Sequence, residues 1–164
     1  MRFFTRDWCN GEMADEESEK VVSNYWSYFD SISEKFPYNI LDFAKEISIH
    51  DGLIRRIIVD RKLTSVHLLL RCGNLQDSYF DLDISNSGVV FNLSDISAFE
   101  SLSKNNESEI LYDEFDIESN RLYVHRIIFH PEHEISVIFS SFSYLKTSKS
   151  SREFDVQTPN FQIL

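Results

Sequence analysis

The stretch that decides the fold is LIRRIIVDRKLTSVHLLLRCGNLQDSYFDLDI, residues 53–84. It predicts three β-strands, at Leu53–Asp60, Leu63–Cys72 and Ser78–Ile84, because apolar and polar side chains alternate with a period of two. The connections between them are short and polar, and Gly73 is a turn former in the second one. Such short links force antiparallel pairing, since a parallel crossover needs about a dozen residues or more.

The third of these strands has the cleanest alternation. Apolar side chains on one face (Phe80, Leu82 and Ile84) alternate with polar side chains on the other (Tyr79, Asp81 and Asp83). An antiparallel sheet often packs one face on the core and leaves the other in water. We therefore expect the side of the sheet that carries the two aspartates to be wet.

Helical periodicity precedes the strands. Between Ala14 and Phe36, apolar residues recur at spacings of three and four, which predicts one amphipathic helix. Pro37 ends or offsets this helix, and a second helix runs from there to about Ile49. The acidic residues in the first turn of the long helix have a structural explanation, because negative charge there favours the helix dipole.

Further strands follow the central three. We expect a short strand at Val89–Leu93, a short helical turn capped by Ser94, and then strands at about Glu109–Ile117, Arg121–Phe129 and Glu134–Tyr144. The prediction is an α+β fold, with two N-terminal helices packed on a mostly antiparallel sheet of six or more strands. We interpret residues 1–164 as a single domain with a helical part (1–52), a sheet (53–145) and a tail (146–164) that forms an edge strand or is partly disordered.

The chain has a net charge of −11 that is unevenly distributed. Residues 1–52 carry five basic and eleven acidic side chains, and residues 105–120 carry six acidic side chains and no basic ones. Direct binding of nucleic acid is therefore not expected, because neutralising phosphates needs clustered Lys and Arg. A basic protein partner is one reading, through electrostatic complementarity, and simple solubility is the other.

Cysteine usage and hydropathy indicate a cytoplasmic protein that does not enter a membrane. Cys9 and Cys72 lie far apart in a chain with no secretory signal, so we expect both to be reduced thiols. Cys72 fits a buried core residue better than a nucleophile. No stretch reaches the apolar length that spans a bilayer.

Most catalytic signatures are absent from the sequence, including phosphate-binding glycine loops, the GxSxG motif and the HExxH motif. The cluster HPEHE at residues 130–134 offers two imidazoles and two carboxylates to a divalent metal, but a polar turn between strands explains it better. His125 fits a hydrogen-bonded core residue, and His50 with Asp51 fits a turn pair. We expect no cofactor and no resident metal.

The feature that most favours a binding function is an acidic row on one predicted strand. Its members are Tyr112, Glu114, Asp116 and Glu118, which alternate with apolar residues and are expected to face outward. Like charges along a strand repel each other, and an arriving cationic surface would relieve that repulsion. We expect the charges of this row to bind a partner, with Tyr112 and Tyr79 as anchors and Asp81 and Asp83 as a second patch. The alternative is a solvated edge strand protected by charge.

Three segments carry a resemblance to known proteins: MRFFTRDW at the start, ISIHDGLIRRIIVD leading into LTSVHLLLRC, and the late VHRIIFHPEHEISVIFSSFSY. Together they resemble bacterial proteins of unknown function with the layout of the DUF4085 family. Proteins of this kind are similar to the small acidic immunity proteins of bacterial polymorphic toxin systems, including contact-dependent growth inhibition. The resemblance implies a non-enzymatic cytoplasmic protein that binds a secreted toxin domain.

The hypothesis from the sequence is thus an immunity protein, a monomer or weak homodimer, that neutralises a basic toxin domain by covering its active or substrate-binding surface. A nuclease is the expected kind of toxin. Two alternatives remain open at this point. One is a metal-assisted hydrolase that uses His130 and His133, and the other is a structural or assembly subunit that pairs through an exposed sheet edge.

Overall fold

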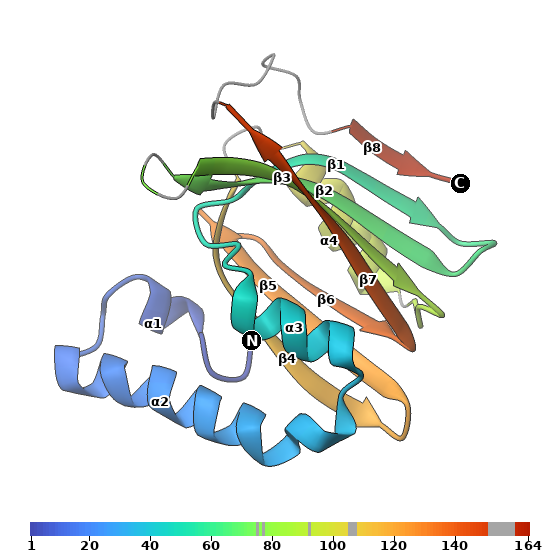
Figure 1. The fold of residues 1–164 in the computed structure, drawn as a ribbon. Helices are drawn as coiled ribbons and strands as arrows, with labels where there is room; N and C mark the ends of the chain where they lie inside the picture. Colours follow the sequence, from blue (N-terminus) through green and yellow to red (C-terminus); the bar gives the residue numbers. More distant parts are fainter. Residues whose placement is uncertain (75, 77, 92, 105–107, 151–159) are drawn as a thin grey trace.

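We analysed a computed structural model that describes residues 1–74, 76, 78–91, 93–104, 108–150 and 160–164 (Figure 1). The helical segments before the sheet are α1 (Arg6–Cys9), α2 (Asp15–Ile32), a 3-10 turn (Ser33–Lys35) and α3 (Tyr38–Glu46). The first helix is capped by the side chain of Thr5, which accepts a hydrogen bond from the backbone N–H of Trp8.

The described residues form eight strands and one further helix. These are β1 (Leu53–Asp60), β2 (Ser65–Asn74), β3 (Ser78–Ser87), α4 (Leu93–Ser103), β4 (Glu109–Ser119), β5 (Leu122–His130), β6 (Glu134–Phe139), β7 (Ser141–Lys149) and β8 (Asn160–Ile163). The strand order in the sheet is β6-β5-β4-β1-β2-β3-β7, and β8 pairs with β1 outside this path. All described pairings between named strands are antiparallel except that of β8 with β1.

The sheet divides into two wings between β1 and β4. These two strands share a single residue pair, Leu53 with Glu109, and then diverge. One wing holds β1, β2, β3 and β7, the other holds β4, β5 and β6, and β8 lies beside β1 where β4 has turned away. Figure 1 shows α4 in the opening between the wings and α2 and α3 on the side of β4.

The two ends of the strand order meet at a corner of the fold. The strands β6 and β7 are the two outermost in that order, yet Ser140 alone separates them in the chain. Gly88 lies against this corner, and a Cβ atom there would come within 2.0 Å of the Oγ atom of Ser140. Because φ of Gly88 is also +62°, a side chain at this position would be strained as well as crowded. The corner makes the sheet curl around the core.

The core lies between the wings and under the helices. Large aromatic side chains fill it, among them Phe29 of α2, Phe43 of α3, Phe115 of β4 and Phe142 of β7, all of which are buried. The ring of Phe43 makes edge contacts with those of Phe115 and Phe142, at centroid distances of 5.7 and 5.1 Å. Packing of this kind joins the helices to both wings in one continuous hydrophobic cluster.

The structure confirms an α+β fold with a mostly antiparallel sheet, and it corrects several details. The expectation of two N-terminal helices is wrong, because α1 forms a further helix before α2. Of the expected strand at Val89–Leu93, the described residues form one bridge, between Val90 and Ile138, and α4 begins at Leu93. The long final strand divides at Ser140, and the expectation for the tail falls partly on 151–159, outside the described residues.

Candidate functional site

The acidic row of β4 is not an outward face, and this part of the prediction is wrong. Glu114 is 1% exposed and Asp116 is 7% exposed. Residues at the start of the chain cover the strand, and the carboxylate of Glu114 accepts hydrogen bonds from the backbone N–H groups of Arg2 at 2.5 Å and Phe3 at 2.9 Å. Glu114 thus holds the N-terminal segment on the sheet.

Basic and hydroxyl groups compensate the two buried carboxylates. Nη1 of Arg126 on the neighbouring strand lies 3.3 Å from Glu114 and 3.1 Å from Asp116. Asp116 also accepts a hydrogen bond from the hydroxyl of Tyr28 on α2. Burial raises the pKa of Asp116, but the hydrogen bonds from Tyr28, Arg126 and the backbone of Ile117 outweigh it and hold the pKa below its usual value. This charge belongs to the interior.

The two ends of the predicted row differ from each other. Tyr112 is half-buried and packs on Phe4 and Trp8, with ring centroids 5.2 and 4.5 Å apart. Glu118 is exposed, as predicted for the whole row. Glu118 is therefore the member of this row that presents a charge to solvent.

The two aspartates of the predicted second patch on β3 also differ in their surroundings. The carboxylate of Asp81 forms ion pairs with three cations. The nearest nitrogen atoms are 2.6 Å away in Arg71, 3.1 Å away in Arg55 and 3.3 Å away in Lys149. Burial raises the pKa of Asp81, but the hydrogen bonds from Arg71 and Lys149 outweigh it and lower the pKa below its usual value. Asp81 therefore offers little uncompensated charge. Tyr79 is half-buried, and Asp83 is exposed.

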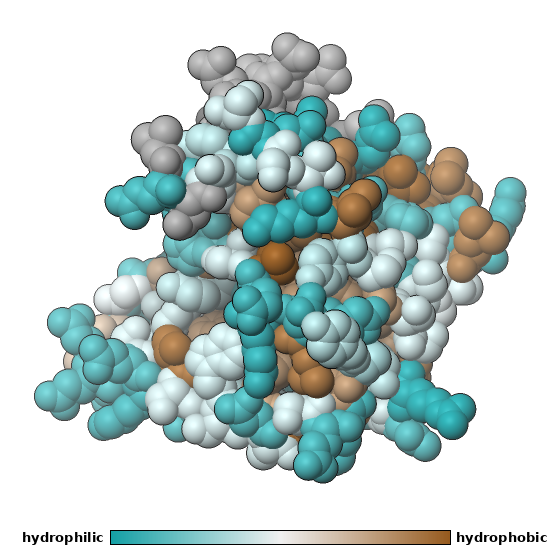
Figure 2. All heavy atoms as spheres, in the orientation of Figure 1, coloured by the Kyte–Doolittle hydropathy of each residue, from teal (hydrophilic) through white to brown (hydrophobic). Residues whose placement is uncertain are grey.

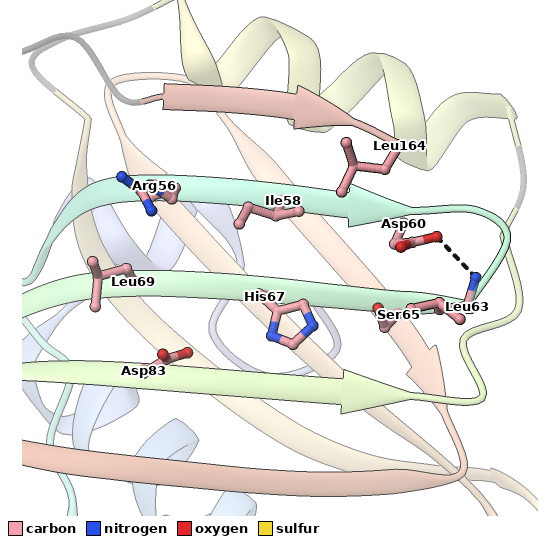
Figure 3. Close-up of a pocket in the computed structure, with 9 residues that line it drawn as sticks. All are labelled: Arg56, Ile58, Asp60, Leu63, Ser65, His67, Leu69, Asp83 and Leu164. Atoms are coloured by element: carbon pink, nitrogen blue, oxygen red, sulfur yellow. Dashed lines mark hydrogen bonds between the residues drawn. The ribbon is translucent and has the colours of Figure 1, made fainter.

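Asp83 lies at the edge of a hollow on the outer face of the sheet, with a volume of about 300 Å³ (Figure 3). Apolar side chains of β1 and β2 and the loop between them share its lining with Arg56, His67 and Asp60. Asp60 is turned toward the loop, where it accepts the backbone N–H of Leu63 at 2.8 Å. Figure 2 shows apolar side chains gathered over this end of the molecule, at the upper right. The mixed charges of the hollow do not select one chemical class of ligand.

A second cleft, with a volume of about 340 Å³, opens between α2 and α3 above β4. Its walls are aromatic, with Tyr25 and Trp26 from α2, and Tyr112 and Phe115 from β4. Trp26 is 37% exposed, so the cleft is open to solvent at that side chain. The hydroxyl of Tyr25 accepts the backbone N–H of Phe115 at 3.0 Å, which fixes the wall of the cleft to the edge of the strand.

The carboxylate of Asp113 forms part of the lining of this cleft, and the side chain is 22% exposed. Its Oδ2 atom lies 2.8 Å from Nε2 of His125, which is fully buried on the neighbouring strand. The imidazole stacks on Phe115 and contacts the rings of Phe43 and Phe142 at their edges. The prediction that His125 is a hydrogen-bonded core residue is confirmed. The sequence alone assigns no role to Asp113, although this residue occupies an otherwise apolar face of its strand.

The other candidate groups remain apart or serve the fold. The turn at residues 130–134 is held by Arg6, which donates hydrogen bonds to the carbonyls of Phe129, Pro131 and His133. Within the described residues, no group of three or more His, Cys, Asp or Glu side chains is placed to hold a metal ion. His50 and Asp51 form an exposed pair at 2.8 Å. Cys72 is buried.

The chain matches no model of a known protein family, no curated protein and no solved structure in the three comparisons made. In the described part of the chain, no helix combines the length and the apolar character that crossing a bilayer requires.

Proposed function

We propose that this chain is an immunity-type protein that binds a basic toxin domain and covers its active or substrate-binding surface. A nuclease is the kind of toxin that best fits an acidic inhibitor, because its substrate channel is cationic. The proposal keeps the function expected from the sequence and moves the binding surface from the sheet to the helical side of the molecule.

The proposal rests on the location of the exposed carboxylates that have no ion pair among the described residues. The acids of β3 and β4 at positions 81, 114 and 116 are neutralised inside the fold. In contrast, five carboxylates at the start of α2 and in the turn before it are exposed and have no ion pair among the described residues: Glu12, Asp15, Glu16, Glu17 and Glu19. Figure 2 shows hydrophilic side chains over this end of α2, at the lower left.

The aromatic cleft lies along the same helix. Trp26 and Tyr25 line it from the C-terminal half of α2, while the exposed acids occupy the N-terminal half and the preceding turn. A surface that combines exposed charge with an aromatic cleft has the composition of a protein interface, where aromatic anchors provide affinity and charge speeds association. The exposed Glu118 and Asp83 lie on other elements and are not needed for this surface.

The experiment that tests the proposal is a pull-down combined with a protection assay. The tagged protein is purified from cells that co-express the gene directly upstream, and growth is measured when the C-terminal domain of that gene product is expressed with and without this chain. A stoichiometric complex together with restored growth supports the proposal. The absence of both a complex and protection would overturn it.

A further inference from the structure

The cleft between α2 and α3 contains a carboxylate, that of Asp113. The attraction of a basic partner to the exposed acids of α2 does not explain its position there. Asp113 of β4 lines the cleft together with the aromatic side chains of Tyr112 and Phe115. The exposed acids of α2 are carried on a helix surface, whereas this carboxylate lies in a hollow with aromatic walls. Placing a carboxylate there has a desolvation cost, so its surroundings must either neutralise the charge or leave it available for a ligand.

The geometry of His125 leaves that charge available. Nε2 of the imidazole contacts Asp113, while Nδ1 is buried without a hydrogen-bond partner among the described residues. A second proton, on Nδ1, would be a buried donor with no acceptor, and such groups are costly. A neutral imidazole that donates from Nε2 leaves only an uncharged acceptor unpaired at Nδ1, which costs less than a buried cation with an unpaired N–H. In that form His125 orients the carboxylate of Asp113 and does not cancel its charge.

The lysine that lines the same cleft does not cancel the charge either. Nζ of Lys45 on α3 lies 3.5 Å from the carboxylate of Asp30 on α2. The next residue, Glu46, adds a negative charge to the lining. The charge on Asp113 also acts on buried groups nearby, since after burial it is the next largest cause that raises the pKa of Tyr25 and of Cys72. The cleft therefore has a net negative lining.

Aromatic walls and a carboxylate are a recognised combination for binding a cation. Aromatic ring faces attract ammonium and guanidinium groups, with tryptophan the strongest of the three aromatic types. A guanidinium group also stacks on rings and donates several hydrogen bonds to a carboxylate, and it is more weakly hydrated than an ammonium group. Trp26, Tyr25 and Asp113 provide these contacts within one cleft.

We propose that this cleft binds the side chain of an arginine presented by the partner protein, with Asp113 as its counter-ion and Trp26 as its aromatic platform. The inference rests on the proposed function insofar as the partner is a basic protein. It goes further, because it names the residue type that the partner inserts and the site that receives it.

The test uses a small probe and does not depend on the identity of the partner. Isotope-labelled protein is titrated with N-acetyl-arginine amide, and the indole N–H signal of Trp26 is followed by NMR. We expect a saturable shift with N-acetyl-arginine amide and no comparable shift with N-acetyl-norleucine amide, which has an apolar side chain. Asp113→Asn should weaken the binding of the arginine probe about tenfold, because a charge-assisted hydrogen bond is lost.

Two further variants keep the test decisive. Trp26→Leu leaves Asp113 and His125 in place and should also weaken binding of the probe, whereas Glu118→Gln, which removes an exposed charge outside the cleft lining, should not. Equal binding of the arginine and norleucine probes would overturn the inference, and so would unchanged binding by Asp113→Asn. If the arginine probe fails while the pull-down yields a complex, the proposed function stands without this site. If the probe binds while neither a complex nor protection is found, the site stands and the proposed function fails.

Discussion

The imidazole of His125 lies flat on the ring of Phe115, with the ring centroids 4.1 Å apart and the planes 9° apart. The two residues face each other on β5 and β4. This stacking fixes the plane of the imidazole, and with it the direction of the hydrogen bond that Nε2 makes with Asp113 at 2.8 Å. The contact between Phe115 and His125 in the core thereby determines the orientation of the Asp113 carboxylate in the cleft.

Replacing His125 by phenylalanine should show what that hydrogen bond contributes. His125→Phe keeps an aromatic ring on Phe115 but leaves the partly buried carboxylate of Asp113 without its donor. We expect a loss of about 1–3 kcal/mol in the free energy of unfolding, the usual cost of an unsatisfied buried polar group. Urea denaturation at pH 7 measures it. A variant as stable as the wild type would show that solvent satisfies Asp113 without the histidine.

Arg126 should be more important for stability than its partial exposure suggests. Arg126→Met removes the cation that lies 3.1–3.3 Å from the buried carboxylates of Glu114 and Asp116 and leaves them with Arg2, which is 3.6 Å from Asp116. Removing one partner from a buried ionic cluster costs about 3–5 kcal/mol. Arg61→Met, at an exposed position, is the matched control and should change stability by about 0.5 kcal/mol or less. Chemical denaturation of the two variants decides the point, and equal stabilities would contradict the assigned role of Arg126.

The acidic row shows which part of the fold the sequence could predict. Alternation of side chains identified most of the strands, and it placed Glu114 and Asp116 correctly on one face of β4. It could not show that the face is covered, because the cover comes from the N-terminal segment, more than 100 residues away in the chain. A signal for this burial was present on the next strand, where residues 122–130 read LYVHRIIFH and are largely apolar on both faces. Strands of this kind are buried on both sides.

Low pH should destabilise the fold through the compensated aspartates. The pKa values of Asp81 and Asp116 are lowered in the folded state, below about 3.9 for an aspartate in the unfolded chain. Their contribution to stability is therefore complete above that pH and is lost as the pH falls through the folded-state values. Urea midpoints measured between pH 7 and pH 2.5 should fall steeply at the acid end. Asp116→Asn should be less stable at pH 7 and show a shallower fall, and a parallel pH profile would contradict this.

The two thiols should react at different rates in the native protein. Cys72 is buried, and burial together with the charges of Asp113 and Asp81 raises its pKa to about 12. Cys9 is half-buried, so we expect a thiol reagent at pH 8 to label it first, while Cys72 reacts when the protein unfolds. Cys9→Ser should remove the early phase of labelling. Early labelling that persists in this variant would show that the interior around Cys72 opens readily.

The exposed acids of α2 should control how fast the partner binds. Reversing Glu16 and Glu19 to lysine places positive charge on the surface that we propose meets a basic toxin domain, and it removes no contact inside the fold, because both side chains are exposed. Electrostatic steering changes association rates by about 10- to 1000-fold and weakens as salt rises. We therefore expect the double variant to associate at least about tenfold more slowly at low ionic strength, with the difference shrinking at high salt.

Lys20→Glu, on the same helix, is the control of opposite sign and should speed association. Stopped-flow mixing with the purified toxin domain at several salt concentrations measures both effects. An association rate that the reversal leaves unchanged would place the docking surface elsewhere, even if the complex itself forms. A fall in the association rate with an unchanged dissociation rate would show that these acids steer the partner, and that the aromatic cleft beside them is the place to look for the contacts that hold it.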